Sequence, residues 1–232
     1  MSIDFALDAD GIALITIYRP ESRNALDAEH YAAISEAWIR VRDDPEVRAA
    51  IITGAGDKAF CAGADIKSYI GRKVEPSELW LTQKGQLLNR GLEVWKPVIA
   101  AVNGQCIGGC TTLLLATDLR VAVKRGVIAA NGGTQRLAQQ LPHCIAMDML
   151  LTGDAMDAAT AERWGLVNKV VPHGELMDAA YDYARRVAAN APLAVQAAKE
   201  LAVRSRDLDL ASGLRMEQMV SRILQQTEDV QE

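Results

Sequence analysis

The stretch KPVIAAVNGQCIGGCTTLLLATDLRVAV, residues 96–123, packs a strand, a tight break, a helix and a second strand into 28 residues. Residues 97–102 (PVIAAV) are apolar without a polar alternation, which is typical of a strand buried on both faces of a sheet. Asn103-Gly104 ends this strand, and a helix is expected to begin at Gly108-Gly109. Residues 119–123 (LRVAV) then predict the next strand. A strand, a helix and a strand in this order predict an α/β fold.

The regions on either side extend this pattern. Before it, the sequence predicts a hairpin, a helix capped by Asp27, a buried strand and another helix, at residues 3–18, 28–42, 49–53 and 75–95. After it, helices are expected at residues 134–141, 145–152, 158–164, 175–189, 193–203 and 208–225, with a short extended piece at 166–171. We therefore expect an α/β core over residues 1–172 and a helical C-terminal region over residues 173–232, without a linker between them.

Composition excludes several classes of protein. The chain has 232 residues and a net charge of -5, and only 5% of its residues are aromatic, which argues against a nucleic-acid-binding surface. No apolar stretch approaches the roughly 20 residues of a membrane helix. The first residues carry no basic flank, so no targeting leader is expected. The four cysteines form no CxxC pair, so we expect no metal site and a reducing, cytoplasmic location.

Two glycine-rich breaks are candidates for chemistry. Ala62-Gly63-Ala64-Asp65 follows the strand at 49–53, and Gly108-Gly109 follows the strand at 97–102. Small residues let backbone N–H groups approach a ligand, and the second break also opens a helix, whose first amides lack partners. Two such amides facing one point form an oxyanion hole, suited to an enolate or a tetrahedral oxyanion. On spacing alone, tight turns or close packing of helix and strand explain these glycines better than an oxyanion hole does. Nucleotide-binding glycine motifs and a GxSxG serine motif are absent.

Six longer motifs carry more information. In chain order they are RPESRNAL (19–26), KAFCAGADIK (58–67), KPVIAAVNGQCIGG (96–109), NGGTQRL (131–137), LLTGD (150–154) and WGLVNKVVP (164–172). Together they resemble the crotonase superfamily, the enoyl-CoA hydratase/isomerase family, across nearly the whole chain. The resemblance implies a spiral core of repeated ββα units that binds acyl-CoA. It also implies that the C-terminal helices build trimers, often paired into hexamers.

The resemblance also implies roles for individual residues. By motif position, the backbone N–H groups of Ala64 and Gly109 hold the thioester carbonyl as the oxyanion hole. Ala62, Asp65, Ile66 and Lys67 line the substrate beside Ala64. Arg23 and Ala25 lie along the nucleotide of coenzyme A, and Arg23 is placed to meet phosphate. For Arg23 and Lys67, a solvated surface charge is an equally good explanation. No metal or separate cofactor is expected, because coenzyme A is part of the substrate.

The sequence departs from the family at its acid/base residues. Hydratases of this family use two glutamates, and one of them belongs three residues after the oxyanion glycine, where this chain has Thr112. A threonine hydroxyl orients water or substrate but is no carboxylate base, and it can equally pack within its helix. The second glutamate belongs to an FGxPE-type stretch, but here Lys124 leads straight into Arg125. Either the protein lacks this stretch, or the sequence as given leaves out a mobile loop between these two residues. We favour the second explanation. Asp118 is expected to be structural.

These observations lead to one functional prediction with two alternatives. We predict reversible addition of water to a 2-enoyl-CoA thioester, as in fatty acid metabolism, through an enolate held by the two amides. Because Thr112 replaces a glutamate, an enoyl-CoA delta-isomerase that uses a single carboxylate is one alternative. A non-catalytic acyl-CoA-binding homologue is the other.

Overall fold

The computed structural model describes residues 2–69, 87–129 and 133–228, and in these residues it contains two sheets. The large sheet has six strands in the order β1 (Ile3–Leu7), β2 (Ile12–Ile17), β3 (Ala49–Gly54), β5 (Val98–Val102), β7 (Leu119–Val123) and β10 (Lys169–Val171). The small sheet has four strands of three residues in the order β4 (Ala59–Cys61), β6 (Gln105–Ile107), β8 (Val127–Ala129) and β9 (Ala155–Asp157). Neighbouring strands are parallel except in the β1–β2 hairpin and the β8–β9 pair.

The two sheets are linked by a repeated path of the chain. Three times the chain forms one strand of the large sheet and then one of the small sheet, as β3–β4, β5–β6 and β7–β8. The helices that come next in the described chain are α2 (Ile66–Tyr69), α4 (Gly109–Leu114) and α5 (Thr134–Gln140). This is the ββα spiral that the resemblance implied. Since β4, β6 and β8 are parallel, the segments that leave their carboxyl ends emerge at one edge of the small sheet.

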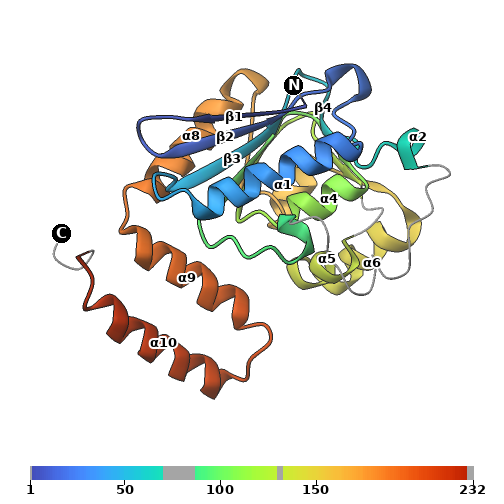
Figure 1. Ribbon diagram of the computed structural model, residues 1–232. Helices are drawn as coiled ribbons and strands as arrows, with labels where there is room; N and C mark the ends of the chain where they lie inside the picture. The colour runs from blue at the N-terminus through green and yellow to red at the C-terminus, as the bar shows by residue number, and fades with distance from the viewer. Residues whose placement is uncertain (1, 70–86, 130–132, 229–232) are drawn as a thin grey trace.

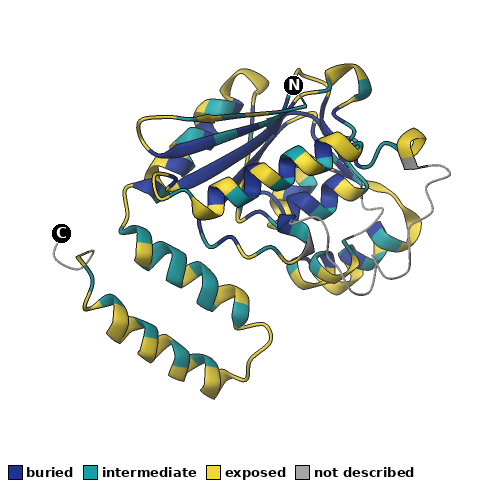
Figure 2. Ribbon diagram, viewed as in Figure 1, coloured by how far each residue is buried: buried dark blue, intermediate teal, exposed yellow. Residues whose placement is uncertain are grey.

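The core lies on both faces of the large sheet (Figures 1 and 2). On one face, Ile51 and Ile99 pack with α8 (Leu176–Ala188). On the other face, Ile52 packs with Trp38 of α1 (Ala28–Asp43), and Phe60 of the small sheet joins the same cluster. These five named apolar side chains of the sheets and of α1 are fully or almost fully buried. Double-sided burial explains why the central strands lack polar alternation.

The remaining helices complete the shell and extend it. α6 (His143–Thr152) and α7 (Ala158–Arg163) follow α5, and the left-handed Gly165 lies just past the end of α7. The last two helices, α9 (Pro192–Arg204) and α10 (Leu210–Leu224), form a hairpin that projects beside the body (Figure 1). We call this hairpin the C-terminal arm. Among the described residues, two ion pairs join it to the body, Lys199 Nζ to Asp118 Oδ2 at 2.7 Å and Arg204 Nη2 to Glu93 Oε1 at 3.3 Å.

Several expectations are confirmed, and one predicted helix is wrong in its described part. The hairpin, the Asp27 cap of α1 and the strands of the large sheet are as predicted: the Asp27 carboxylate accepts the His30 N–H at 3.1 Å. The predicted helix at 75–95 lies partly outside the described residues, and its described part is only a 3₁₀ turn at Leu88–Arg90. Gly91, with φ of 96°, ends that turn. The small sheet was not foreseen, because three-residue strands are too short to show a period.

Helix α8 lies beyond residue 172, in the predicted C-terminal region, yet it packs on the large sheet of the core. The division at 172 stays a prediction. Throughout the described ranges, no helix has the length and hydropathy needed to cross a bilayer.

Candidate active site

The loops after β4 and β6 meet at very short range. Gly63 has φ of 87°, and a β-carbon added there would lie 2.8 Å from the Ile107 carbonyl oxygen and 3.0 Å from the Gly109 nitrogen. A side chain therefore does not fit between the two loops. A β-carbon on Gly109 would lie 3.9 Å from the Ala64 nitrogen. The two glycines thus bring the backbone at Ala64 close to the first residue of α4. Tight turns alone do not require so close an approach of the two loops.

The N–H groups at this meeting point differ from their neighbours. Nearby amides have acceptors: Ala62 N–H donates to Arg23 O at 3.0 Å, Asp65 N–H to Leu26 O at 2.8 Å, and Gly108 N–H to Ala129 O at 3.2 Å. Within the described part of the chain, Ala64 N–H and Gly109 N–H donate to no acceptor. Gly109 is exposed and Ala64 is half-buried, so both amides border solvent. The arrangement fits the predicted oxyanion hole, which stays a prediction.

Three thiols lie beneath these amides. Cys61 Sγ accepts the Gly63 N–H at 3.3 Å, and Cys106 Sγ lies 3.1 Å from Cys110 Sγ. All three side chains are fully buried, and burial raises the pKa of the Cys110 thiol well above its ordinary value. Cys144 on α6, by contrast, is exposed. All four are unpaired, and no cluster that could hold a metal ion occurs among the residues described.

Asp65, predicted to bind substrate, is held by a distant arginine. Arg19 Nη1 lies 2.8 Å from Asp65 Oδ2 and 3.4 Å from Asp27 Oδ2, and it donates to Ala25 O at 3.3 Å. The hydrogen bond from Arg19 lowers the pKa of the Asp65 carboxyl. Asp65 is therefore ionised at neutral pH and engaged in holding the chain, not placed as a proton acceptor. Sequence reasoning did not single out Arg19, which lies 46 positions away.

The other predicted substrate residues of this loop lie at the surface. Ile66 is 72% exposed and opens the short helix α2, and Lys67 beside it is also exposed. Ala62 is half-buried next to β4. Ile66 and Lys67 contribute little to the core.

The turn that carries Arg23 and Ala25 is built around Asn24. Both Arg23 and Asn24 have left-handed backbones, with φ of 54° and 57°. The buried Asn24 amide donates to Ala55 O at 3.0 Å and Ala59 O at 2.8 Å, which fixes this conformation. Arg23 is exposed and its guanidinium reaches Gln105 Oε1 at 3.4 Å, while Ala25 is half-buried. A hollow of about 260 Å³ lies here, between Arg23 and Lys58.

The helix after the glycines places Thr112 one turn beyond Gly109. Its side chain is half-buried and faces the start of α5, because a β-carbon on Gly133 would lie 3.8 Å from Thr112 Oγ1. The neighbouring Thr111 is buried and donates its hydroxyl to Ala129 O at 2.8 Å. Asp118, expected to be structural, accepts the Val98 N–H at 2.7 Å and the Lys199 ion pair.

The model of one protein family, described as enoyl-CoA hydratase/isomerase, matches residues 8–232. The chain belongs to the enoyl-CoA hydratase/isomerase family. It is 41% identical over 234 residues to (E)-benzylidenesuccinyl-CoA hydratase of Thauera aromatica, covering 95% of this chain and 90% of the relative. It is 40% identical over 226 residues to carnitinyl-CoA dehydratase of Salmonella arizonae, covering 93% and 86%. The crystal structure of enoyl-CoA hydratase from Bacillus anthracis matches with a TM-score of 0.92 at 31% identity, covering 100% of this chain and 94% of that one.

In this member of the family, a buried arginine holds the far end of the helix that begins at Gly109. Arg120 donates to the carbonyls of Leu114 at 3.0 Å, Leu166 at 3.0 Å and Thr117 at 2.8 Å. Burial lowers its pKa to about 10, so it stays charged at neutral pH. Carbonyls at a helix C-terminus attract a cation, and the arginine thereby fixes the axis of α4. No sequence signal pointed to Arg120.

The family's second-glutamate stretch has no counterpart in the described fold. Residues 124–126 form a tight turn between β7 and β8, closed by Gly126 N–H donating to Val123 O at 2.8 Å. The expected omission of a loop here stays a prediction. The mass of the purified chain tests it, since 25.1 kDa corresponds to the direct connection.

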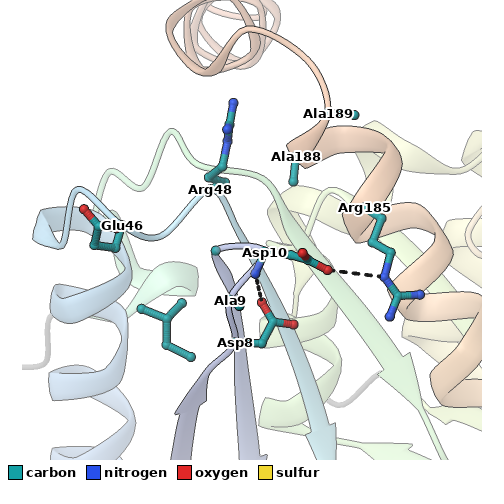
Figure 3. A pocket seen from close by; sticks show the side chains of 10 residues that line it. Asp8, Ala9, Asp10, Glu46, Arg48, Arg185, Ala188 and Ala189 are labelled. Atoms are coloured by element: carbon teal, nitrogen blue, oxygen red, sulfur yellow. Dashed lines mark hydrogen bonds and ion pairs between the residues drawn. The ribbon is translucent and has the colours of Figure 1, made fainter.

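A second hollow lies elsewhere on this family member (Figure 3). It measures about 830 Å³ and is lined by the β1–β2 turn, Glu46, Arg48 and the end of α8. Three of its charged side chains have protein partners: Arg185 Nε lies 3.7 Å from Asp10 Oδ2, and Arg48 donates to Asn190 O at 3.2 Å. It contains none of the predicted site residues.

Proposed function

We propose that this chain is an enoyl-CoA hydratase-type lyase, which adds water reversibly to the double bond of a 2-enoyl-CoA thioester. The observation that carries the proposal is the pair of amides at Ala64 and Gly109. They lie side by side at the surface and, among the described residues, have no acceptor. Relatives of similar length that are named hydratase and dehydratase of CoA thioesters support the same chemistry.

The amides match the charge that this reaction develops. When water adds to the far carbon of the double bond, negative charge collects on the thioester oxygen as an enolate. Two N–H groups already aimed at that oxygen stabilise it, and losing one such donor costs roughly 3–4 kcal/mol. In this proposal Thr112 orients water or substrate beside the amides. Ala62, Asp65, Ile66 and Lys67 line the acyl-CoA, and Arg23 and Ala25 lie along its nucleotide. No separate cofactor takes part.

The proposal extends to self-association and location. The C-terminal arm has no buried residue in α9 or α10, yet Leu210, Met219 and Ile223 are more than 60% exposed there. A trimer or hexamer built through the arm accounts for these exposed apolar side chains. Four unpaired cysteines support a cytoplasmic location.

Two substrates test the activity. With crotonyl-CoA and a 3-enoyl-CoA supplied separately, the proposal expects the first to be hydrated, which removes the absorbance of its conjugated double bond. Conversion of only the 3-enoyl-CoA identifies an isomerase, which the loss of one glutamate at Thr112 favours. Binding of both without turnover identifies a non-catalytic acyl-CoA-binding protein. Either of these two results overturns the hydratase proposal.

A further inference from the structure

A tyrosine hydroxyl lies close to the glycine that carries one of the two amides. Tyr31 belongs to the first turns of α1, whose N-cap Asp27 directly follows Leu26, the residue that pairs with Ala64. A β-carbon on Gly109 would lie 3.7 Å from Tyr31 Oη and 3.9 Å from the Ala64 nitrogen. Setting aside Gly109's own helix and chain neighbours, these are the only described atoms within 4 Å of that position.

The anchoring of α1 fixes where this hydroxyl lies. The Leu26 N–H donates to Gly63 O at 2.8 Å, and the Asp65 N–H donates to Leu26 O at 2.8 Å, so the start of α1 is tied to both sides of Ala64. Tyr31 N–H donates to Asp27 O at 3.0 Å within the first turn. The ring is half-buried against the main core. Tyr31 and Ala64 are therefore held by the same short set of backbone hydrogen bonds.

We propose that Tyr31 is a catalytic residue that donates a third hydrogen bond to the thioester oxygen of the bound acyl-CoA. This inference rests on the proposed function, because it takes the two amides as the place where that oxygen binds. A tyrosine side chain carries one O–H group, which can donate a hydrogen bond to such an oxygen. The proton stays on Tyr31 Oη throughout, so no bond to it breaks.

The neighbouring side chains make a hydrogen bond from Tyr31 important for the reaction. The Asp65 carboxylate is held by Arg19, and Thr112 stands where the family has a glutamate. The enolate oxygen carries more charge than the thioester oxygen of the substrate, so a hydrogen bond to it strengthens as the reaction proceeds. Tyr31 therefore lowers the barrier more than it tightens substrate binding.

The kinetic test uses Tyr31→Phe, which removes the hydroxyl and keeps the ring. The expected result is a fall in kcat for crotonyl-CoA hydration of about 100-fold, the effect of losing one oxyanion donor, with KM changed by no more than about twofold. Tyr18→Phe is the matched control, since Tyr18 is 57% exposed at the end of the hairpin, and it should keep full activity. Unchanged kcat in Tyr31→Phe overturns the inference.

A spectroscopic test separates this inference from the activity itself. Butanoyl-CoA labelled with ¹³C at its carbonyl is saturated and does not react, and a hydrogen bond to its oxygen lowers the infrared stretching frequency. Bound to the natural chain, the label should show a lower frequency than when bound to Tyr31→Phe, while Tyr18→Phe matches the natural chain. Equal frequencies in the natural chain and Tyr31→Phe overturn the role of Tyr31. A frequency difference without turnover of crotonyl-CoA upholds Tyr31 as a donor and overturns the hydratase activity. If butanoyl-CoA does not bind at all, both proposals fail.

Discussion

The two-sheet body buries its apolar side chains, whereas the C-terminal arm leaves large apolar side chains exposed. In the body, the central strands β3 and β5 are buried along their whole length, and α8 covers one face with Leu176 and small alanines. In the arm, α9 and α10 pack on each other, yet neither has a buried residue. Figure 2 shows the contrast directly. The body completes its core within one chain, whereas the arm presents an apolar surface that one chain leaves uncovered.

The largest expected effect comes from removing a large side chain from the core of the body. Trp38→Ala removes a fully buried side chain from the main core, so the free energy of unfolding should fall by about 3–5 kcal/mol. Leu210→Ala in the arm, where the side chain is 77% exposed, should cost under about 1 kcal/mol in a dilute sample. Urea denaturation measures both. Similar losses in the two variants would contradict the contrast between body and arm.

The next effect tests the close approach of the two loops in the body. Gly63→Ala forces a methyl group to within 2.8 Å of Ile107 O and 3.0 Å of the Gly109 nitrogen, so the amides must move apart. Displacement of a reacting group by about 1 Å costs about 100-fold in rate, and we expect at least that loss in crotonyl-CoA hydration.

The control for this substitution is Gly153→Ala. Gly153 has a positive φ of 75°, close to that of Gly63, but an added β-carbon meets nothing within 4 Å. Both variants therefore carry backbone strain, and only Gly63→Ala carries the clash. Equal activity in the two would mean that the separation of the loops does not matter for catalysis.

The third prediction concerns the surface of the arm. Met219 is 62% exposed on α10, and Met219→Asp places a charge on the proposed interface. Burying a side chain of this size contributes roughly 1.5–3 kcal/mol, so self-association should weaken by about 10- to 100-fold per site. Gln218→Asp introduces the same charge at the neighbouring exposed position and should have a smaller effect. Analytical ultracentrifugation over a dilution series measures the change, and an unchanged mass for Met219→Asp excludes this face as the interface.

The smallest effect is the pH dependence of the Arg19–Asp65 pair. Since the folded pKa of Asp65 is lowered, the ionised carboxylate stabilises the fold above the ordinary aspartate pKa of about 3.9. That contribution is lost as the pH falls through the folded pKa. Asp65→Asn should therefore lower Tm at pH 7, and the difference from the natural chain should shrink near pH 3. A difference in Tm that stays constant from pH 7 to pH 3 would rule out this ion pair as the cause.

The sequence predicted the large sheet better than the site. Strands β3 and β5 are five or six residues long and apolar on both faces, which leaves a clear signal. The strands of the small sheet have three residues and leave none, although they carry both glycine-rich loops. The glycines at 63 and 109 could be recognised in the sequence, because few other residues allow two backbone segments to approach so closely. Arg19 and Tyr31 were missed because their roles depend on partners 46 and 78 positions away, which no local pattern reports.

Chemical labelling of the buried thiols can report local opening of the natural chain. Cys144 is exposed on α6, so a maleimide reagent should label one cysteine per folded chain and four after denaturation. Cys61, Cys106 and Cys110 lie on the segments that carry the two amides, and burial keeps the Cys110 thiol protonated and slow to react. Their labelling rate in native buffer therefore reports how often this part of the fold opens to solvent, with no engineered probe.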